Sequence, residues 1–439
     1  LHDALPILLF HTLEASGTGL YVNQISVTVD GLDADRMAQA WQHMIDRYAV
    51  LRTGFLWRSG LSRPLQMVFG SAVAEVVQLD WQGKHDLQRW IEAYAETELK
   101  REFDFLHPPL ARLCLIRTGK NRHQLIWTHH HILFDGWSHT LLIRDWLDDY
   151  YGKSLRQAGP DYGFYLRWLE KQPSQVARQF WQTELAQLEG PTLLAQAVRQ
   201  AAPRDKSADF ALLYTRWDAE ETSRLQDFVQ RQHITLNTLV QAAWALLLQR
   251  YCGKEIIVFG ATVAGRPLSL ARSDEMVGLF INTIPVPVQR RNHLTVAEYL
   301  HALQEMNVRL RDFEHTALAN IQRWAGYSGQ PLFDSIVVFE NYPVDAALRN
   351  SESDGLQFGA MHSKGMTGYA MDLQVVAGTT LEIEYAYSCN DFNESFVQNL
   401  RLHMESLMRE MMIDALRPVG ELPWVSQQEH ARLLSLRST

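Results

Sequence analysis

Residues 127–138 read Trp-Thr-His-His-His-Ile-Leu-Phe-Asp-Gly-Trp-Ser. They leave a strand-like segment over residues 124–128, and an apolar helical pattern follows Gly136. Polar and ionisable side chains cost free energy inside a core, and they are commoner where a chain leaves a sheet and meets a ligand. We therefore interpret this strand-to-helix turn as the candidate functional site.

The spacing of the three histidines argues against a metal site. Successive side chains of a strand point to opposite faces, so His129 and His131 share a face and His130 points the other way. Only His131 and Asp135 could converge on one ion, which is too few ligands for zinc. We predict that no metal binds here.

Acid–base chemistry fits the same residues better. An imidazole titrates near 6.5, so His131 can take and give a proton near neutral pH while His130 packs backwards and orders the loop. Gly136 allows close backbone approach, and its N–H at a helix start can face a developing negative charge. Composition alone leaves a purely structural role open for all three histidines.

The rest of the chain alternates strands and helices, which predicts an α/β fold. Strands are expected over 22–30, 113–116, 124–128, 210–217 and 255–262, and helices after Asp33 or Asp35, over 162–188 and over 236–251. The segment 189–207 is the best linker candidate. Ala40-Trp41 and Ala243-Trp244 each precede an Arg-Tyr pair by the same five residues, which two related lobes would explain.

Composition limits the classes of function. The 439 residues carry 41 Lys+Arg against 50 Asp+Glu, a net charge of -9, so no global basic footprint for nucleic acid exists. The composition does not exclude local basic patches that bind an acidic protein partner. No apolar run reaches the ~20 residues of a membrane span, and no signal peptide is visible. Three separated cysteines predict free thiols in a reducing cytoplasm.

The segment His130–Gly136 resembles the HHxxxDG signature of the condensation domains of nonribosomal peptide synthetases. Other stretches are similar to family motifs in the same order and cover nearly the whole chain: residues 46–55, 258–267, 276–283, 321–323 and 339–343. Two motif positions depart from the family, Tyr48 where His is usual and Ala264 in place of Ser. Leu1 to Ile7 do not match the family's opening segment and are interpreted as a fragment-boundary or cloning remnant.

The resemblance implies a fold and a reaction. Family members have two chloramphenicol-acetyltransferase-like lobes that form a V-shaped pseudodimer with the active site in a tunnel at their junction. The lobes here would span residues 1–188 and 189–439, with segments near 269–283 and 362–376 crossing back to the first lobe. The family joins an acceptor amine to a donor thioester, both tethered on phosphopantetheine arms of peptidyl carrier proteins, so the domain itself binds no cofactor.

The resemblance also implies residue roles. His131 would orient the amine and accept its proton, acting as a base or by positioning, and His130 would pack. Asp135 would pair with Arg266, or else with Arg52. The remaining candidates are substrate contacts, namely Gly136 and Asn282 for the thioester or pantetheine and Trp137 and Ser138 for the acceptor side. A structural tie between lobes for Asn282, and helix-start packing for Trp137 and Ser138, are equally open.

Alternatives remain within and outside this family. An epimerisation domain shares the fold and the signature but abstracts an α-proton, and a catalytically silent scaffold would only bind carrier proteins. The stretch Val277–Thr283 and the Gly-Trp-Ser after Asp135 favour condensation. Residues 418–439 resemble the lead-in to an adenylation domain, and residues 9–13 and 339–345 favour an L-configured donor.

Overall fold

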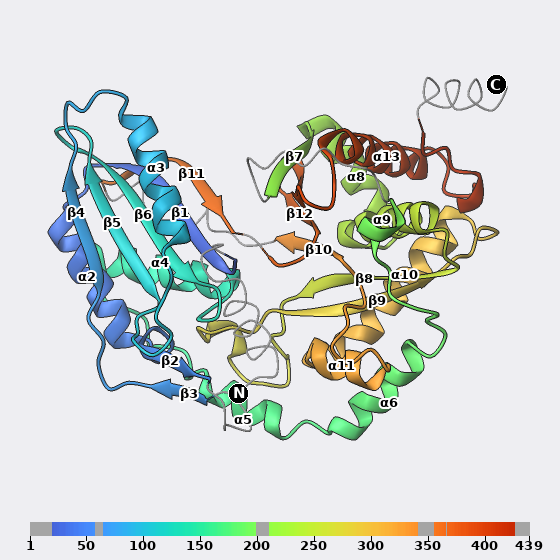
Figure 1. The fold of residues 1–439 in the computed structure, drawn as a ribbon, viewed down its shortest axis with the longest axis horizontal. Coiled ribbons are helices and arrows are strands. Elements are labelled where there is room, and N and C mark those ends of the chain that lie inside the picture. The colour runs from blue at the N-terminus through green and yellow to red at the C-terminus, as the bar shows by residue number, and fades with distance from the viewer. Residues whose placement is uncertain (1–19, 58–64, 199–209, 341–354, 366, 426–439) are drawn as a thin grey trace. The chain divides into compact units, whose positions relative to one another are not determined.

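Contacts divide the computed structural model into two units, each built from a mixed sheet and helices, in agreement with the predicted α/β class (Figure 1). The structure describes residues 20–57, 65–198, 210–340, 355–365 and 367–425. Unit 1 comprises residues 1–172, 264–281 and 342–368, and unit 2 comprises residues 173–263, 282–341 and 369–439. The predictions about residues 1–7, 9–13, 341–345 and 426–439 concern parts of the chain outside the described residues.

Unit 1 contains a five-stranded sheet of order β11-β1-β6-β5-β4 and a separate antiparallel pair, β2 and β3. The β4–β5 pair is parallel and the other pairs of the larger sheet are antiparallel. The elements are β1 (Val22–Asp30), α2 (Ala34–Arg47), η1 (Ala49–Arg52), β2 (Thr53–Leu56), β3 (Leu65–Val68), β4 (Glu75–Asp80), α3 (Leu87–Lys100), β5 (Ala111–Arg117), β6 (Arg122–His130), α4 (Gly136–Tyr150), α5 (Gly163–Glu170), η2 (Ser273–Glu275) and β11 (Gln357–Lys364).

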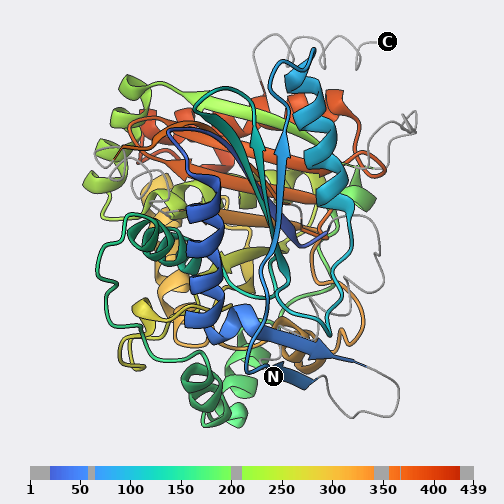
Figure 2. The ribbon, with the colours of Figure 1, turned by 90° about the vertical axis from the view of Figure 1, so that its left-hand side faces the viewer.

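Alternation along β6 separates two apolar layers of unit 1. Trp127 packs with Trp41 of α2 and Trp146 of α4 on one face of the sheet. Ile126 belongs to a second cluster with Ile91 of α3 on the other face (Figures 1 and 2). Because side chains alternate in a strand, this pattern also decides on which face each histidine at the end of β6 lies.

Unit 2 contains a six-stranded sheet of order β7-β13-β12-β10-β8-β9. The strand β9 carries Pro285 and Pro287, which lack an N–H donor, and it lies at the edge where no second ladder is needed. The elements are α6 (Ser174–Glu184), α7 (Leu194–Ala197), β7 (Phe210–Trp217), α8 (Ala219–Arg231), α9 (Leu236–Cys252), β8 (Ile256–Val263), β9 (Asn282–Gln289), α10 (Val296–Arg311), α11 (Leu318–Trp324), β10 (Ser335–Glu340), β12 (Met371–Ala377), β13 (Leu381–Ser388), α13 (Glu394–Ile413) and η4 (Val419–Glu421).

The helix α9 is the centre of the unit 2 core. It is buried on nearly all sides, carries the fully buried Trp244, and contacts α8, α10, α13 and β8. Thr235 caps its start and Gly253, in the left-handed conformation, ends it. The prediction that Trp41 and Trp244 are core residues is confirmed.

The structure corrects the predicted boundary at residues 188 and 189. The segment 162–188 is two helices, α5 and α6, because Pro173 interrupts the helical pattern. The second helix belongs to unit 2, where Trp181 and Leu185 join the core. The first boundary therefore falls between Gln172 and Pro173.

The segments that return to unit 1 also differ from those expected. Residues 264–281 and 342–368 belong to unit 1, and β11 pairs antiparallel with β1, with His362 opposite Ser26. The strand β12 stays in unit 2 because it pairs with β10 and β13. Residues 418–424 are not free linker, since Val419 and Leu422 are buried in the unit 2 core.

Among the described residues, no helix combines the length and the apolar character that a membrane span requires.

Removal of the Trp181 side chain tests the corrected boundary. Trp181→Ala should leave a cavity and destabilise its surroundings by about 3–5 kcal/mol. Hydrogen exchange should then accelerate in α9 and α11 of unit 2 rather than in α2 and α4 of unit 1. The half-exposed Trp90→Ala is the control and should leave both groups of amides unchanged. Faster exchange confined to unit 1 would contradict the assignment of α6.

Candidate active site

The end of β6 positions the histidines through main-chain hydrogen bonds. His129 lies opposite Asn23 of β1 and Ala111 of β5 in the sheet. Beyond it, the His130 N–H donates to the Leu110 carbonyl at 2.9 Å, and the His131 N–H donates to the Tyr21 carbonyl at 2.7 Å. The sheet therefore holds the backbone of all three residues before the chain turns into α4.

His130 is a structural residue of the turn. Its ring is buried, and its Nδ1 accepts a hydrogen bond from the Ile132 N–H at 3.1 Å. The rings of Phe103 and Phe105 meet it edge-on, with centroids at 6.3 and 5.0 Å. Burial lowers the pKa of His130 to about 3, so the ring is neutral at physiological pH.

His129 lies on the opposite face in a cluster of aromatic rings. Its ring centroid is 5.0 Å from that of Trp127, 4.4 Å from that of Phe134 and 5.4 Å from that of His139. Burial lowers the pKa of His129 well below its ordinary value, and it lowers the pKa of His139 to about 3. Both rings therefore act as uncharged packing groups.

His131 differs from its two neighbours because it is partly exposed. Burial lowers its pKa below the ordinary 6.5, while its own main chain, the Asp135 carboxylate and the main chain of Phe134 oppose that shift. The imidazole is thus in its neutral, proton-accepting form near neutral pH. This is the form that a general base requires.

Asp135 is a buried carboxylate with every contact directed at the protein. Oδ1 accepts from the Ser138 N–H at 2.9 Å, which caps α4, and from Arg266 Nη2 at 3.0 Å. Oδ2 accepts from the Phe280 N–H at 3.0 Å. The side chains of Asp135 and Arg266 are only 2% and 7% exposed, so the charge is neutralised inside the protein rather than offered to a substrate.

The alternative partner Arg52 is ruled out by its own contacts. Its Nη1 donates to the Ile45 carbonyl at 2.6 Å and to the Asp46 carbonyl, and its Nε donates to the Phe69 carbonyl at 3.2 Å. Arg52 therefore closes the turn between α2 and β2, and Arg266 is the residue that faces Asp135.

Ser138 does not line a substrate site. The side chain is fully buried, and its hydroxyl donates to the Gly278 carbonyl at 2.8 Å. The same oxygen accepts from the Gly278 N–H at 3.0 Å and from Arg266 Nη2 at 2.8 Å. All of the hydrogen-bonding capacity of Ser138 joins α4 to the segment 264–281, which favours the alternative of helix-start packing over an acceptor contact.

Trp137 and Gly136 remain available at the start of α4. Trp137 is 39% exposed, and its Nε1 donates to the Asp274 carbonyl at 2.8 Å. Gly136 is the first residue of the helix, so its N–H has no carbonyl partner within the helix. Both residues keep a surface that a substrate could contact.

Asn282 is a structural residue of unit 2. Its Nδ2 donates to the Glu314 carbonyl at 2.8 Å and to the Thr316 carbonyl at 2.7 Å, and its Oδ1 accepts from the Thr283 N–H. Both amide hydrogens are therefore used, and the expected contact to a thioester is not supported. These hydrogen bonds all stay within unit 2, so they do not support the alternative of a tie between lobes either.

Sequence reasoning missed Tyr162, which supports the segment 264–281. Its hydroxyl donates to the Leu279 carbonyl at 2.5 Å, and a Cβ on Gly278 would lie 2.1 Å from its ring. Gly265 has φ +63°, and a Cβ there would lie 1.8 Å from the Phe280 carbonyl oxygen. Gly265 and Gly278 lie in the family-like stretches 258–267 and 276–283, so the sequence could have indicated their importance. Tyr162 lies in no such stretch, and no local pattern indicated it.

No metal centre is found in the described part of the chain. Among those residues, no group of three or more His, Cys, Asp or Glu side chains is placed to hold an ion.

Comparisons with known proteins place this site in a family context. The family model described as Condensation domain matches residues 7–434. One of the proteins that make up the linear gramicidin synthase of Brevibacillus parabrevis is 34% identical over 435 residues. The match covers 97% of this chain and 6% of that protein, so the chain spans a small fraction of the length of such relatives.

Solved structures share the fold. A four-domain nonribosomal peptide synthetase bound to AMP and glycine matches with a TM-score of 0.80 at 18% identity, covering 98% of this chain and 34% of that one. The first condensation domain of the calcium-dependent antibiotic synthetase, in complex with a substrate analogue, matches with a TM-score of 0.77 at 17% identity. That match covers 97% of this chain and 99% of the other. The chain therefore has the two-lobed acetyltransferase-like fold of these proteins.

The buried ion pair gives a stability prediction. Arg266→Ala leaves the Asp135 carboxylate buried without a countercharge and should lower the free energy of unfolding by about 3–5 kcal/mol. The matched control in the same segment is Arg272→Ala, which breaks an exposed 2.7 Å pair with Glu275 and should change stability little. Denaturant unfolding measures both variants. Similar losses for the two would contradict a special role for Arg266.

Proposed function

Because the chain belongs to the Condensation domain family, we propose that it forms peptide bonds between two carrier-bound substrates. The acceptor amine attacks the carbonyl carbon of the donor thioester, and a C–N bond forms as the C–S bond breaks. The amine proton passes to His131 and then to the departing thiolate. The products are an amide on the acceptor and a free thiol on the donor carrier.

The position of His131 is the observation that supports this proposal most. His130 and Asp135, the other ionisable groups of the signature, are buried and held by hydrogen bonds to the protein. His131 is partly exposed, and burial lowers its pKa toward the neutral form. It is therefore the group of the signature that can meet an amine and remove its proton.

The rest of the site would act by positioning. A thioester is already activated, so no covalent intermediate with the protein is required. Holding amine and thioester in reacting geometry can contribute about 7–11 kcal/mol. The Gly136 N–H, at the positive end of α4, would stabilise negative charge on the thioester oxygen, and Trp137 would line the acceptor side.

The partners follow from the reaction. We propose that donor and acceptor peptidyl carrier proteins deliver the substrates on phosphopantetheine arms, with no cofactor bound by the domain itself. An adenylation domain would adjoin it in a parent synthetase. A net charge of -9 on 439 residues gives no nucleic-acid footprint and fits carrier partners that need only local basic patches. The cytoplasm would be the place of action.

Removal of the base tests the proposal. With two carrier proteins loaded with aminoacyl groups, dipeptide formation followed by mass spectrometry should fall about 10²–10⁴-fold in His131→Ala. The exposed His85→Ala is the matched control and should retain the wild-type rate.

Three outcomes of this experiment would contradict the proposal. Equal rates in wild type and His131→Ala would exclude the proposed role of that residue. Inversion of the α-centre without a new amide would identify an epimerisation domain. Carrier binding without either product would identify a silent scaffold.

The pH dependence tests the protonation state of His131. Since burial lowers its pKa, the neutral base persists to lower pH than a free imidazole allows. Single-turnover rates between about pH 5 and 8 should therefore show an acid limb with its midpoint below the ordinary value of about 6.5. The deprotonation of the acceptor amine gives a separate limb at higher pH. A single limb above 6.5 that His131→Ala leaves in place would contradict this assignment.

A further inference from the structure

A hollow of about 660 Å³ lies in unit 2 between the helices α8 and α13 (Figure 1). Ligand-binding hollows of proteins measure about 300–1,000 Å³, so this one has the size of a site for a small organic molecule. The signature residues 130–136 belong to unit 1. The hollow of unit 2 is therefore built from residues that the candidate active site does not use.

Guanidinium groups without a counter-ion border this hollow. Arg224 and Arg231 lie seven residues apart on α8, so they lie on the same face of the helix. Both are exposed, and neither forms an ion pair with a described residue. Arg231 Nε donates to the Asp227 carbonyl of its own helix at 3.3 Å, which leaves both of its Nη groups available. These groups can bind an anion that enters the hollow.

A third guanidinium group, that of Arg409 on α13, is held in place by its neighbours. Its Nη2 donates to Glu221 Oε1 of α8 at 2.9 Å, and its Nη1 lies 3.8 Å from Glu405 Oε2. Its Cζ lies 5.9 Å from the centroid of the Trp217 ring. In the described part of the chain, its other N–H groups have no hydrogen-bond partner. A guanidinium group that is already fixed loses less entropy when it binds an anion.

The charges that line the hollow have a small positive sum. Three are positive, on arginines, and two are negative, on Glu221 and Asp227, which gives a net charge of +1. Glu221 is paired with Arg409, whereas the exposed Asp227 carboxylate forms no ion pair with a described residue. One negative charge on a ligand would balance this sum, and Asp227 would repel a second one.

Apolar side chains supply the rest of the lining. Trp217 and Phe228 are buried, Met412 is partly exposed, and Ile413 is 68% exposed. A ligand in the hollow can therefore remove the apolar surface of Met412 and Ile413 from water, which is favourable. The lining thus fits a molecule that has both an apolar body and a charged group.

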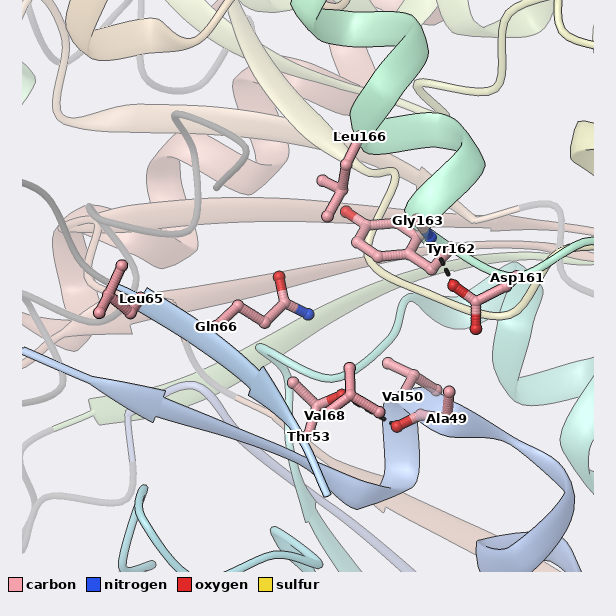
Figure 3. Close-up of a pocket in the computed structure, with 10 residues that line it drawn as sticks. All are labelled: Ala49, Val50, Thr53, Leu65, Gln66, Val68, Asp161, Tyr162, Gly163 and Leu166. Atoms are coloured by element: carbon pink, nitrogen blue, oxygen red, sulfur yellow. Dashed lines mark hydrogen bonds between the residues drawn. The ribbon is translucent and has the colours of Figure 1, made fainter. Parts of the chain in front are cut away.

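A second hollow, in unit 1, differs in its charges. It measures about 250 Å³ and lies between the hairpin β2–β3 and the start of α5 (Figure 3). Its charged residue is Asp161, whose Oδ1 accepts from the Gly163 N–H at 2.7 Å (Figure 3). No lysine or arginine is among the described residues that line it. An organic anion should therefore bind in unit 2 and not in this hollow.

We propose that the hollow between α8 and α13 is a binding site for a small organic monoanion, a flat aromatic ring system that carries one carboxylate. The carboxylate would accept hydrogen bonds from Arg224 and Arg231, and the ring system would cover Met412 and Ile413. Guanidinium groups also stack on aromatic faces, which favours an aromatic body. The condensation chemistry does not require this site, so the two proposals are independent.

Binding of 2-naphthoate to the intact chain tests the proposal. Isothermal titration should detect saturable one-site binding, and the neutral 2-naphthamide should bind more weakly. The double variant Arg224→Gln/Arg231→Gln should weaken 2-naphthoate binding about tenfold, the effect of two exposed ion pairs. Asp227→Asn should strengthen binding about two- to fivefold, because a like charge is removed. The exposed Arg89→Gln in α3 is the matched control and should bind as wild type does.

Two further variants test the location of the ligand. Ile413→Asp places a carboxylate at the apolar lining and should abolish binding, whereas Leu166→Trp fills the hollow of unit 1 and should leave binding unchanged. Circular dichroism confirms that each variant is folded before titration. The proposal is overturned if folded wild type does not bind 2-naphthoate at millimolar concentration, or if Leu166→Trp abolishes binding. Equal affinities for 2-naphthoate and 2-naphthamide would refute the recognition of the carboxylate.

Discussion

The buried carboxylate of Asp135 is the constraint on which unit 1 depends. It caps α4 through the Ser138 N–H, neutralises Arg266, and accepts the Phe280 N–H. These donors come from segments more than 120 residues apart in the chain, so Asp135, together with Ser138 and Tyr162, holds residues 264–281 in unit 1. Burying such a charge is unfavourable unless every lone pair finds a donor, and here the donors are present.

This arrangement gives the residues of the HHxxxDG signature different roles. His130 and Asp135 are held by the protein, and His131 between them is left partly exposed on a backbone that the sheet fixes. Burial also keeps the surrounding imidazoles of His129 and His139 uncharged. A neutral, low-dielectric surrounding strengthens the effect of any remaining charge or dipole, including the helix start at Gly136.

Much of the local structure could be predicted from the sequence. The alternating pattern predicted β1 with its observed bounds, Val22–Asp30, and the side chain of Asp33 caps α2 as expected. The prediction of one helix over residues 162–188 was wrong. The helical pattern continues on both sides of Pro173, but the chain forms two helices there. Motif resemblance led to Arg266 as partner of Asp135, yet it also led to Ser138 and Asn282 as substrate contacts, which their hydrogen bonds do not support.

The sequence by itself determined the α/β class, the opposite faces of His129 and His130, and the family to which the signature points. These properties depend on strand alternation and on residues close together in the chain. Only the tertiary structure decided that Arg266 rather than Arg52 faces Asp135, that Tyr162 supports Gly278, and that α6 belongs to unit 2. Those contacts join residues that are far apart in sequence. A local sequence pattern does not show which distant side chains come within hydrogen-bond distance when the chain folds.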